Sequence, residues 1–141
     1  MALASYYAGM AFSRTSVGYV HAIAHTLGAT YGTPHGWANA LVLPHVLDYC
    51  AGPSCRRLSE LADLMEIQGA SDEERARRFI DAVRELKAEV GIPLYLDDLK
   101  IDDIPSIAQR ACKEAWANYP VPRYMEQEDA ERLISKLLAP S

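Results

Sequence analysis

Apolar residues along the 141-residue chain recur at the 3.6-residue period of an α-helix, and no stretch alternates convincingly with period two. The most regular pattern lies between residues 71 and 90, where Ala76, Ile80, Val83 and Lys87 (through its alkyl stem) fall on the expected buried side. We therefore predict an all-α fold without an internal repeat. The expected helices cover residues 1–12, a segment ending at Gly32, and residues 36–49, 54–67, 71–90, 102–118 and 126–138.

Capping and helix-breaking residues separate these segments. Ser71 followed by Glu74 forms a capping box, and Gly91 is suited to end the same helix. The run 32–34, Gly-Thr-Pro, indicates a turn between two helices, and the run 51–53, Ala-Gly-Pro, predicts a further break. Each predicted helix is thus bounded by residues typical of helix ends.

The first segment, residues 1–12, is apolar and rich in small residues. It lacks the basic start of a signal peptide, and no apolar run in the chain approaches membrane-spanning length. Ala4, Ala8 and Ala11 would form a small-residue face that lets another helix approach closely. We predict that this segment is a core helix.

Composition predicts one soluble domain, residues 1–141, in the cytoplasm. Half of the residues are hydrophobic and 23% are charged, which is typical of a globular chain able to bury a core. The net charge of -5, without a basic stripe, argues against nucleic acid as a partner, and the absence of a long apolar run argues against a membrane. Cys50, Cys55 and Cys112 contain no C-x-x-C, and we interpret them as reduced thiols, with a Cys50–Cys55 bridge or a thiolate metal site as the lesser alternatives.

All four histidines lie in one short region, at positions 21, 25, 35 and 45. His21 and His25 are spaced to share one helix face, and the predicted turn would let His35 fold back beside them. Imidazole is a common ligand of transition metals and moves protons near neutral pH. The spacing is equally compatible with a structural pair hydrogen-bonded to backbone or carboxylates. We interpret His45 as structural.

Other chemical signatures are missing from the sequence. Neither H-E-x-x-H nor E-x-x-H is present, so no metalloprotease or bundle di-iron motif is indicated. There is no G-x-G-x-x-G, and the glycines at 28 and 32 do not follow a predicted strand. The chain therefore offers no sequence signal for nucleotide binding.

The run GYVHAIAHTLGATYGTPHGWANALVLPHVLDY resembles the signature of the iron-containing (group III) alcohol dehydrogenases. The preceding ASYYAGMAF and the later segments VGIPLYLDDL and DIPSIAQRA are similar to that family too, whereas the likeness weakens beyond Tyr119. Glycerol dehydrogenases and dehydroquinate synthases share the wider fold but usually carry an H-G-E string, so the alcohol dehydrogenase branch fits better. The matched signature positions are Gly18, His21, Ala22, His25, Leu27, Gly28, Pro34, His35, Gly36, Asn39, Ala40, Leu43 and Pro44.

The resemblance implies a fold, a site and a cofactor. The fold is the helical bundle domain of the dehydroquinate synthase-like, iron-containing alcohol dehydrogenase type, without the N-terminal α/β domain that binds NAD(P). His21 and His35 match the two histidine ligands of a divalent metal, Fe²⁺ ahead of Zn²⁺, and His25 matches a histidine used in proton handling or substrate placement. The metal would act as a Lewis acid on the oxygen of a small alcohol or aldehyde substrate. The role of Trp37 is open, with packing preferred over a substrate wall.

The sequence also lacks part of that site. In the family, an Asp and a His from a D-x-x-x-H helix complete the metal site, and this chain contains no such string. Our first hypothesis is therefore the metal-site domain of an NAD(P)-linked alcohol dehydrogenase, acting with a nucleotide-binding domain that these residues do not include. The alternative is a stand-alone helical scaffold or binding domain without catalysis. For the isolated chain we expect no dehydrogenase activity, some exposed hydrophobic surface, and a tendency to form homo-oligomers or to pair with a complementing nucleotide-binding domain.

Overall fold

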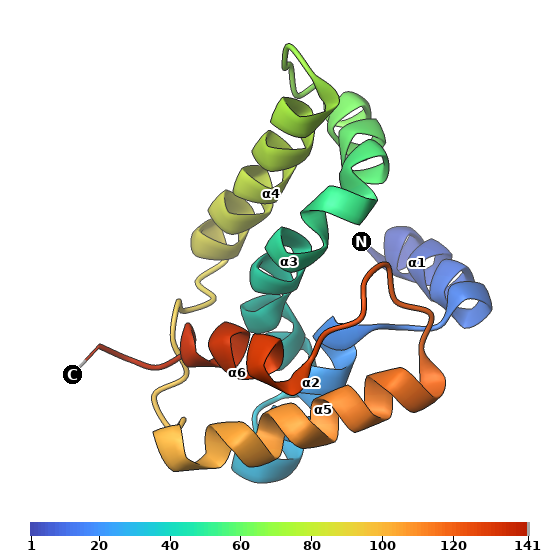
Figure 1. The fold of residues 1–141 in the computed structure, drawn as a ribbon. Helices are drawn as coiled ribbons and strands as arrows, with labels where there is room; N and C mark the ends of the chain where they lie inside the picture. Colours follow the sequence, from blue (N-terminus) through green and yellow to red (C-terminus); the bar gives the residue numbers. More distant parts are fainter. Residues whose placement is uncertain (141) are drawn as a thin grey trace.

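The structure is a computed structural model that describes residues 1–140. These residues form six α-helices and one 3₁₀ helix, with no β-strand among them, so the predicted all-α class is confirmed (Figure 1). The elements in chain order are α1 (Ala2–Thr15), α2 (Tyr19–Tyr31), α3 (His35–Leu64), α4 (Asp72–Glu89), η1 (Ile101–Asp103), α5 (Ile104–Asn118) and α6 (Gln127–Ser135).

The core forms around α2, which packs against both α3 and α5, while α6 packs on α5. Fully buried apolar side chains from these helices fill the space between them. A second, smaller cluster joins the far half of α3 to α4, and the two helices project together from the core (Figure 1). The largest buried side chains of the main core include Ile23, Leu27, Leu41, Ile107 and Ile134.

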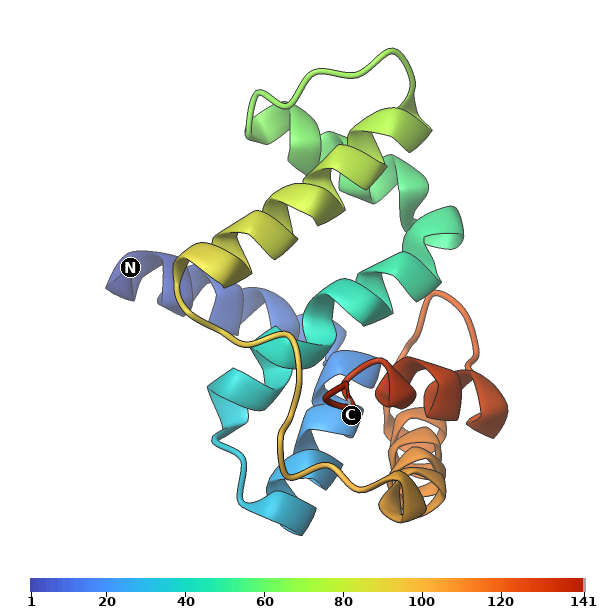
Figure 2. The ribbon, with the colours of Figure 1, turned by 90° about the vertical axis from the view of Figure 1, so that its left-hand side faces the viewer.

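The predicted helix break at residues 51–53 is wrong. α3 continues through this run and contains both Pro44 and Pro53 within one helix, although Figure 2 shows that it bends strongly near its middle. A proline removes one backbone hydrogen bond and kinks a helix, but it does not have to end it. Beyond the bend, Leu58 is buried in the packing against α4, which keeps the second half helical.

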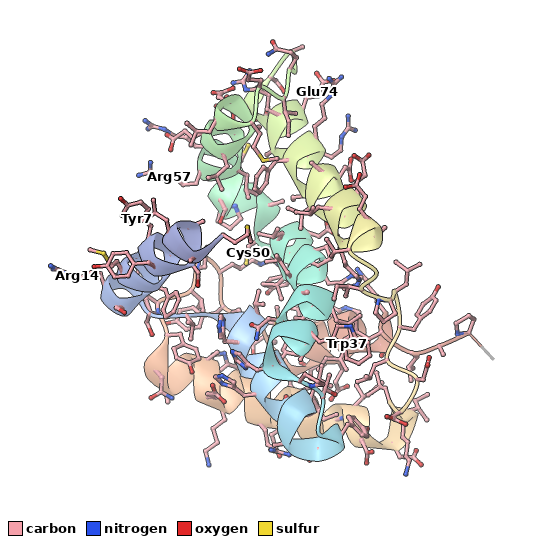
Figure 3. The ribbon with its side chains drawn as sticks, turned by 180° about the vertical axis from the view of Figure 1, so that it is seen from behind. Tyr7, Arg14, Trp37, Cys50, Arg57 and Glu74 are labelled. Carbon is pink, nitrogen blue, oxygen red and sulfur yellow. The ribbon has the colours of Figure 1, made fainter. Side chains whose placement is uncertain are left out.

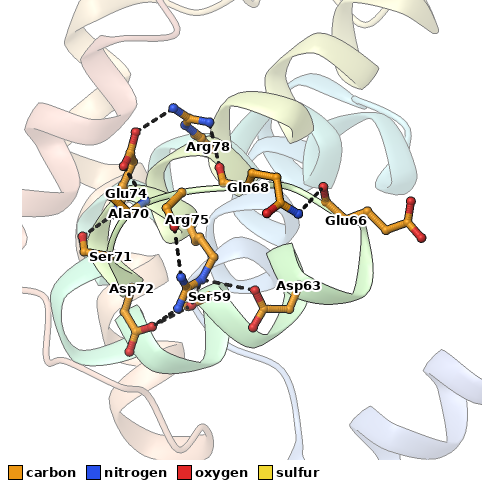
Figure 4. Close-up of polar contacts among 11 residues, drawn as sticks. Ser59, Asp63, Glu66, Gln68, Ala70, Ser71, Asp72, Glu74, Arg75 and Arg78 are labelled. Carbon is orange, nitrogen blue, oxygen red and sulfur yellow. Dashed lines mark hydrogen bonds and ion pairs between the residues drawn. The ribbon is translucent and has the colours of Figure 1, made fainter.

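The predicted cap of α4 is confirmed. The backbone N–H of Glu74 donates to Ser71 Oγ at 3.2 Å, and the Glu74 carboxylate accepts from the N–H of Ala70 at 2.7 Å (Figure 4). Arg75 adds a link back to α3, because its Nε donates to Ser59 Oγ at 2.8 Å. These bonds fix the turn that brings α4 back along α3.

The buried stripe of α4 runs through Ala76, Ile80 and Lys87, and Lys87 is only 7% exposed. These positions follow the i, i+4, i+11 spacing of one helix face. Leu86 and Val90, which also fit the apolar period, lie beside that face and are exposed. The sequence pattern therefore predicted the helix correctly and its apolar face somewhat too broadly.

The prediction that the first segment is a core helix is wrong in this chain. α1 is helical, but none of its residues is buried. It lies at the edge of the molecule, with Tyr7 and Arg14 pointing away from the other helices (Figure 3). Leu3, Tyr6 and Met10 are exposed as well, so α1 carries the apolar surface that the sequence led us to expect.

The last two predicted helices are confirmed, with α6 ending earlier than expected, at Ser135. Cys50, Cys55 and Cys112 are free thiols, and Cys50 and Cys112 are buried. Among residues 1–140, no helix is both long enough and apolar enough to cross a membrane.

Candidate metal centre

A helix–turn–helix unit presents the histidines. α2 ends at Gly32, whose φ of 69° is left-handed and whose N–H donates to the Gly28 carbonyl at 2.9 Å. Pro34 then precedes His35, the first residue of α3. The turn is tight, because a side chain at Gly28 would place its Cβ only 3.3 Å from the Thr33 carbonyl oxygen. This geometry reverses the chain and returns His35 toward α2.

The turn brings three of the four histidines together. The ring centroids of His21 and His35 lie 5.3 Å apart, those of His25 and His35 also 5.3 Å, and those of His21 and His25 5.8 Å. The rings of His25 and His35 are stacked, with an interplanar angle of 18°. The fold-back that the sequence only allowed is therefore present.

His45 lies apart from this cluster. It lines a different cavity of about 270 Å³ with Asp48, Tyr49 and Lys136, between α3 and α6. Burial and the nearby charge of Lys87 lower the pKa of His45 to about 4, so it is neutral at physiological pH. The structural role of His45 stays a prediction.

The surroundings favour neutral imidazole at His21. Burial lowers the pKa of His21, and the neighbouring His35 and His25 lower it further. A metal binds the neutral ring, because a protonated nitrogen has no lone pair to donate. The electrostatics at His21 therefore suit a ligand better than a permanent cation.

Asn39 braces His35 from the next turn of α3. Its Nδ2 donates to the His35 carbonyl oxygen at 2.8 Å and lies 3.2 Å from Nε2 of the same residue. Its Oδ1 is buried and has no hydrogen-bond partner within the described residues. Asn39 belongs to the signature stretch, and its contacts give that position a physical role.

Sequence reasoning missed one residue of the site, Glu114 on α5. Its Oε1 lies 2.7 Å from Nδ1 of His25 and accepts a hydrogen bond from the Tyr119 hydroxyl at 2.6 Å. Glu114 and His25 are 89 positions apart, so no local spacing could have indicated the pair. Only the packing of α5 on α2 brings them together.

Two open cavities flank the histidine cluster. One, of about 440 Å³, is lined mostly by apolar groups, including Val20 and Leu43, beside His21 and His35. The other, of about 490 Å³, lies on the His25 side and includes Glu114, Arg110 and Lys113. A small molecule could therefore reach the cluster from either side.

Trp37 packs, half-buried, against the main core. Figure 3 shows it at the start of α3, where it helps to anchor the helix that begins with His35. This is the packing role preferred from the sequence.

The described residues fit a metal only in part. Within residues 1–140 there is no group of three or more His, Cys, Asp or Glu side chains placed to hold a metal ion. His21 and His35 nevertheless offer two nitrogen ligands from two different helices, held close by the turn. Transition metals usually need at least three protein ligands, so these two rings alone do not complete a site.

Comparison with known proteins identifies the class. Residues 1–138 match the sequence profile described as Fe-containing alcohol dehydrogenase family, C-terminal. The chain belongs to this family, as its C-terminal helical domain.

Individual relatives agree with this assignment. The chain is 45% identical over 115 residues to a lactaldehyde reductase of Escherichia coli K12, covering 79% of this chain and 30% of that protein. It is 42% identical over 134 residues to a 1,3-propanediol dehydrogenase of Klebsiella pneumoniae, covering 92% of this chain and 35% of that protein. The crystal structure of a 1,3-propanediol oxidoreductase superposes with a TM-score of 0.85 at 37% identity, covering 93% of this chain and 35% of that one. The chain thus spans about a third of the length of these relatives.

Proposed function

We propose that this chain is the metal-site domain of a metal-dependent, NAD(P)-linked alcohol dehydrogenase that converts small alcohols and aldehydes. His21 and His35 would hold the metal, Fe²⁺ by family or Zn²⁺. The observation that carries the proposal is the 5.3 Å separation of these two rings, which come from different helices and are held by a fixed turn. When bound, a divalent metal supplies Lewis acidity to the substrate oxygen.

The chain's own residues would do the remaining work at this centre. The cavity beside His21 and His35 is lined mainly by apolar groups, which suits the carbon chain of a small alcohol. The side chain of His25 is 41% exposed and faces the second cavity, so it can exchange a proton with a substrate hydroxyl. We assign proton handling to His25 on this basis.

The remaining parts of the enzyme would come from outside these residues. We infer that a nucleotide-binding domain supplies the NAD(P) site and the other metal ligands, since no group of three metal-binding side chains occurs in residues 1–140. The exposed apolar side chains of α1, including Leu3, Tyr6 and Met10, offer a surface on which that domain could pack. The relatives, which are about three times longer than this chain, are named for lactaldehyde and 1,3-propanediol, and the substrate class proposed here follows those names.

A chimera tests the proposal. The C-terminal part of the Klebsiella pneumoniae 1,3-propanediol dehydrogenase that this chain matches would be replaced by this chain, and NAD(P)-linked oxidation of 1,3-propanediol would be measured. We expect turnover in the chimera and none in the 141-residue chain alone. His21→Ala and His35→Ala should abolish the chimera's activity, whereas His45→Ala, a histidine in a different cavity, should preserve it.

The same experiment addresses the alternative of a stand-alone helical scaffold. A folded chimera that binds NAD(P) but has no turnover would favour the scaffold. Turnover that survives both His21→Ala and His35→Ala would contradict the roles assigned to those residues.

A further inference from the structure

One carboxylate reaches the histidine cluster, and it does so from a different helix. Glu114 extends from α5 to Nδ1 of His25 on α2, with 2.7 Å between nitrogen and oxygen. The Glu114 side chain is 28% exposed, so the contact lies at the inner edge of the cavity on the His25 side. At this distance the two groups share a strong hydrogen bond.

A second donor fixes the same carboxylate oxygen. The Tyr119 hydroxyl donates to Glu114 Oε1 at 2.6 Å. This bond and partial burial raise the pKa of Tyr119 to about 12, so the phenol keeps its proton. Glu114 is thereby held from two sides, by α2 and by the segment that follows α5.

The proton on the His25 ring follows from this arrangement. An ionised carboxylate has no proton to donate, so a hydrogen bond to Glu114 requires the proton to be on Nδ1 of His25. In the neutral ring the other nitrogen, Nε2, then carries the lone pair. The carboxylate thus selects one of the two tautomers.

We propose that Glu114 is a positioning residue that holds His25 in the Nδ1–H tautomer and leaves Nε2 free to accept the substrate proton. This inference rests on the proton-handling role proposed above for His25. Glu114 acts through the ring and does not touch the substrate. Carboxylates commonly orient an active imidazole through its second nitrogen in this way.

We expect the contact between Glu114 and His25 to contribute little to the free energy of unfolding. Its effect on the orientation of the His25 ring can therefore be measured apart from any effect on stability. Both side chains are partly open to solvent, and solvent-exposed contacts between polar side chains stabilise a fold only weakly. Replacing Glu114 should therefore leave the fold intact while releasing the ring. The variant can then be tested for the tautomer of His25. That tautomer would not change if Glu114 only packed beside the ring.

Nitrogen NMR of the 141-residue chain, labelled with ¹⁵N in histidine and free of metal, measures that tautomer. Four imidazoles give few signals, and His25→Gln identifies the His25 pair by its loss. The spectra are recorded at about pH 8, above the ordinary pKa of a histidine in a peptide. We expect the Nδ1–H form for His25 in the natural chain, a shift to mainly the Nε2–H form in Glu114→Ala, and retention of Nδ1–H in Glu114→Gln, because the amide oxygen still accepts.

Glu85→Ala is the matched control, because Glu85 is an exposed glutamate on α4, outside the site. It should leave the His25 signals unchanged. A His25 ring that is already Nε2–H in the natural chain, or that stays Nδ1–H in Glu114→Ala, overturns the inference. The first of these outcomes does not depend on Glu114→Ala, so the test holds even if that variant fails to fold.

Failure of the proposed function would be seen in the turnover of the chimera. The NMR experiment uses no metal, nucleotide or substrate, so its result is independent of that turnover. In an active chimera, Glu114→Ala should lower kcat about 10- to 100-fold with KM little changed, and Glu114→Gln should restore most of the rate. Equal losses in the two variants would overturn the positioning role.

Discussion

Replacing Tyr19 with phenylalanine should weaken the fold measurably. Tyr19 is 2% exposed, and its hydroxyl oxygen accepts a hydrogen bond from the backbone N–H of Met125 at 2.8 Å. The two residues are 106 positions apart, so this bond ties the start of α2 to the segment that precedes α6. Met125 is fully buried at 0% exposure, so its N–H is shielded from bulk solvent.

The size of the effect follows from the group left unpaired. Phenylalanine keeps the ring and its packing, so the main loss is the acceptor for a buried N–H. An unsatisfied buried donor costs about 1–3 kcal/mol. A chain of this size is stabilised by roughly 5–15 kcal/mol, so the substitution should remove a substantial part of the free energy of unfolding.

Urea unfolding followed by circular dichroism measures the change. Tyr7→Phe is the matched control, because Tyr7 lies on α1, is 60% exposed, and should change the free energy of unfolding by no more than about 0.5 kcal/mol. A Tyr19→Phe variant as stable as the Tyr7→Phe variant would refute the argument that this hydroxyl stabilises the core.

Two further predictions concern α4 and His45. Ser71→Ala removes the acceptor for the Glu74 N–H and should cost about 1 kcal/mol in urea unfolding; an unchanged midpoint would show that the cap contributes nothing. Burial and the charge of Lys87 lower the pKa of His45 to about 4 in the folded chain, whereas the ordinary value in an unfolded chain is about 6.5. Between these two pH values the unfolded chain binds a proton that the folded chain does not. The free energy of unfolding should therefore fall as the pH falls through this window, and His45→Gln should reduce the fall. An equally steep fall in both proteins would contradict this.

Local sequence signals predicted most of the helices. The 3.6-residue period and the Ser71 cap located α4, and Gly32 with Pro34 located the turn between α2 and α3. The break predicted at residues 51–53 failed because glycine and proline are local signals, whereas the packing of Leu58 against α4 is not. For α1, the apolar pattern predicted a helix but could not show which surface would cover it.

In the candidate site, too, local sequence signals predicted some residues and missed one that depends on packing. His21, His25 and His35 lie within one short stretch, so their spacing and the turn were enough to predict that they could meet. Glu114 was beyond such reasoning, because its contact with His25 depends on how α5 crosses α2. The chain has 19 aspartates and glutamates, and nothing in the sequence distinguishes Glu114 among them.

The metal content of the purified chimera tests the central claim most directly. Fe²⁺ or Zn²⁺ would be supplied anaerobically, excess metal removed, and the metal bound per chain measured for the chimera and for His21→Ala, His35→Ala and His45→Ala. We expect about one metal ion per chain in the unaltered chimera and in His45→Ala, and little in the other two variants. Full metal content in both His21→Ala and His35→Ala would contradict it.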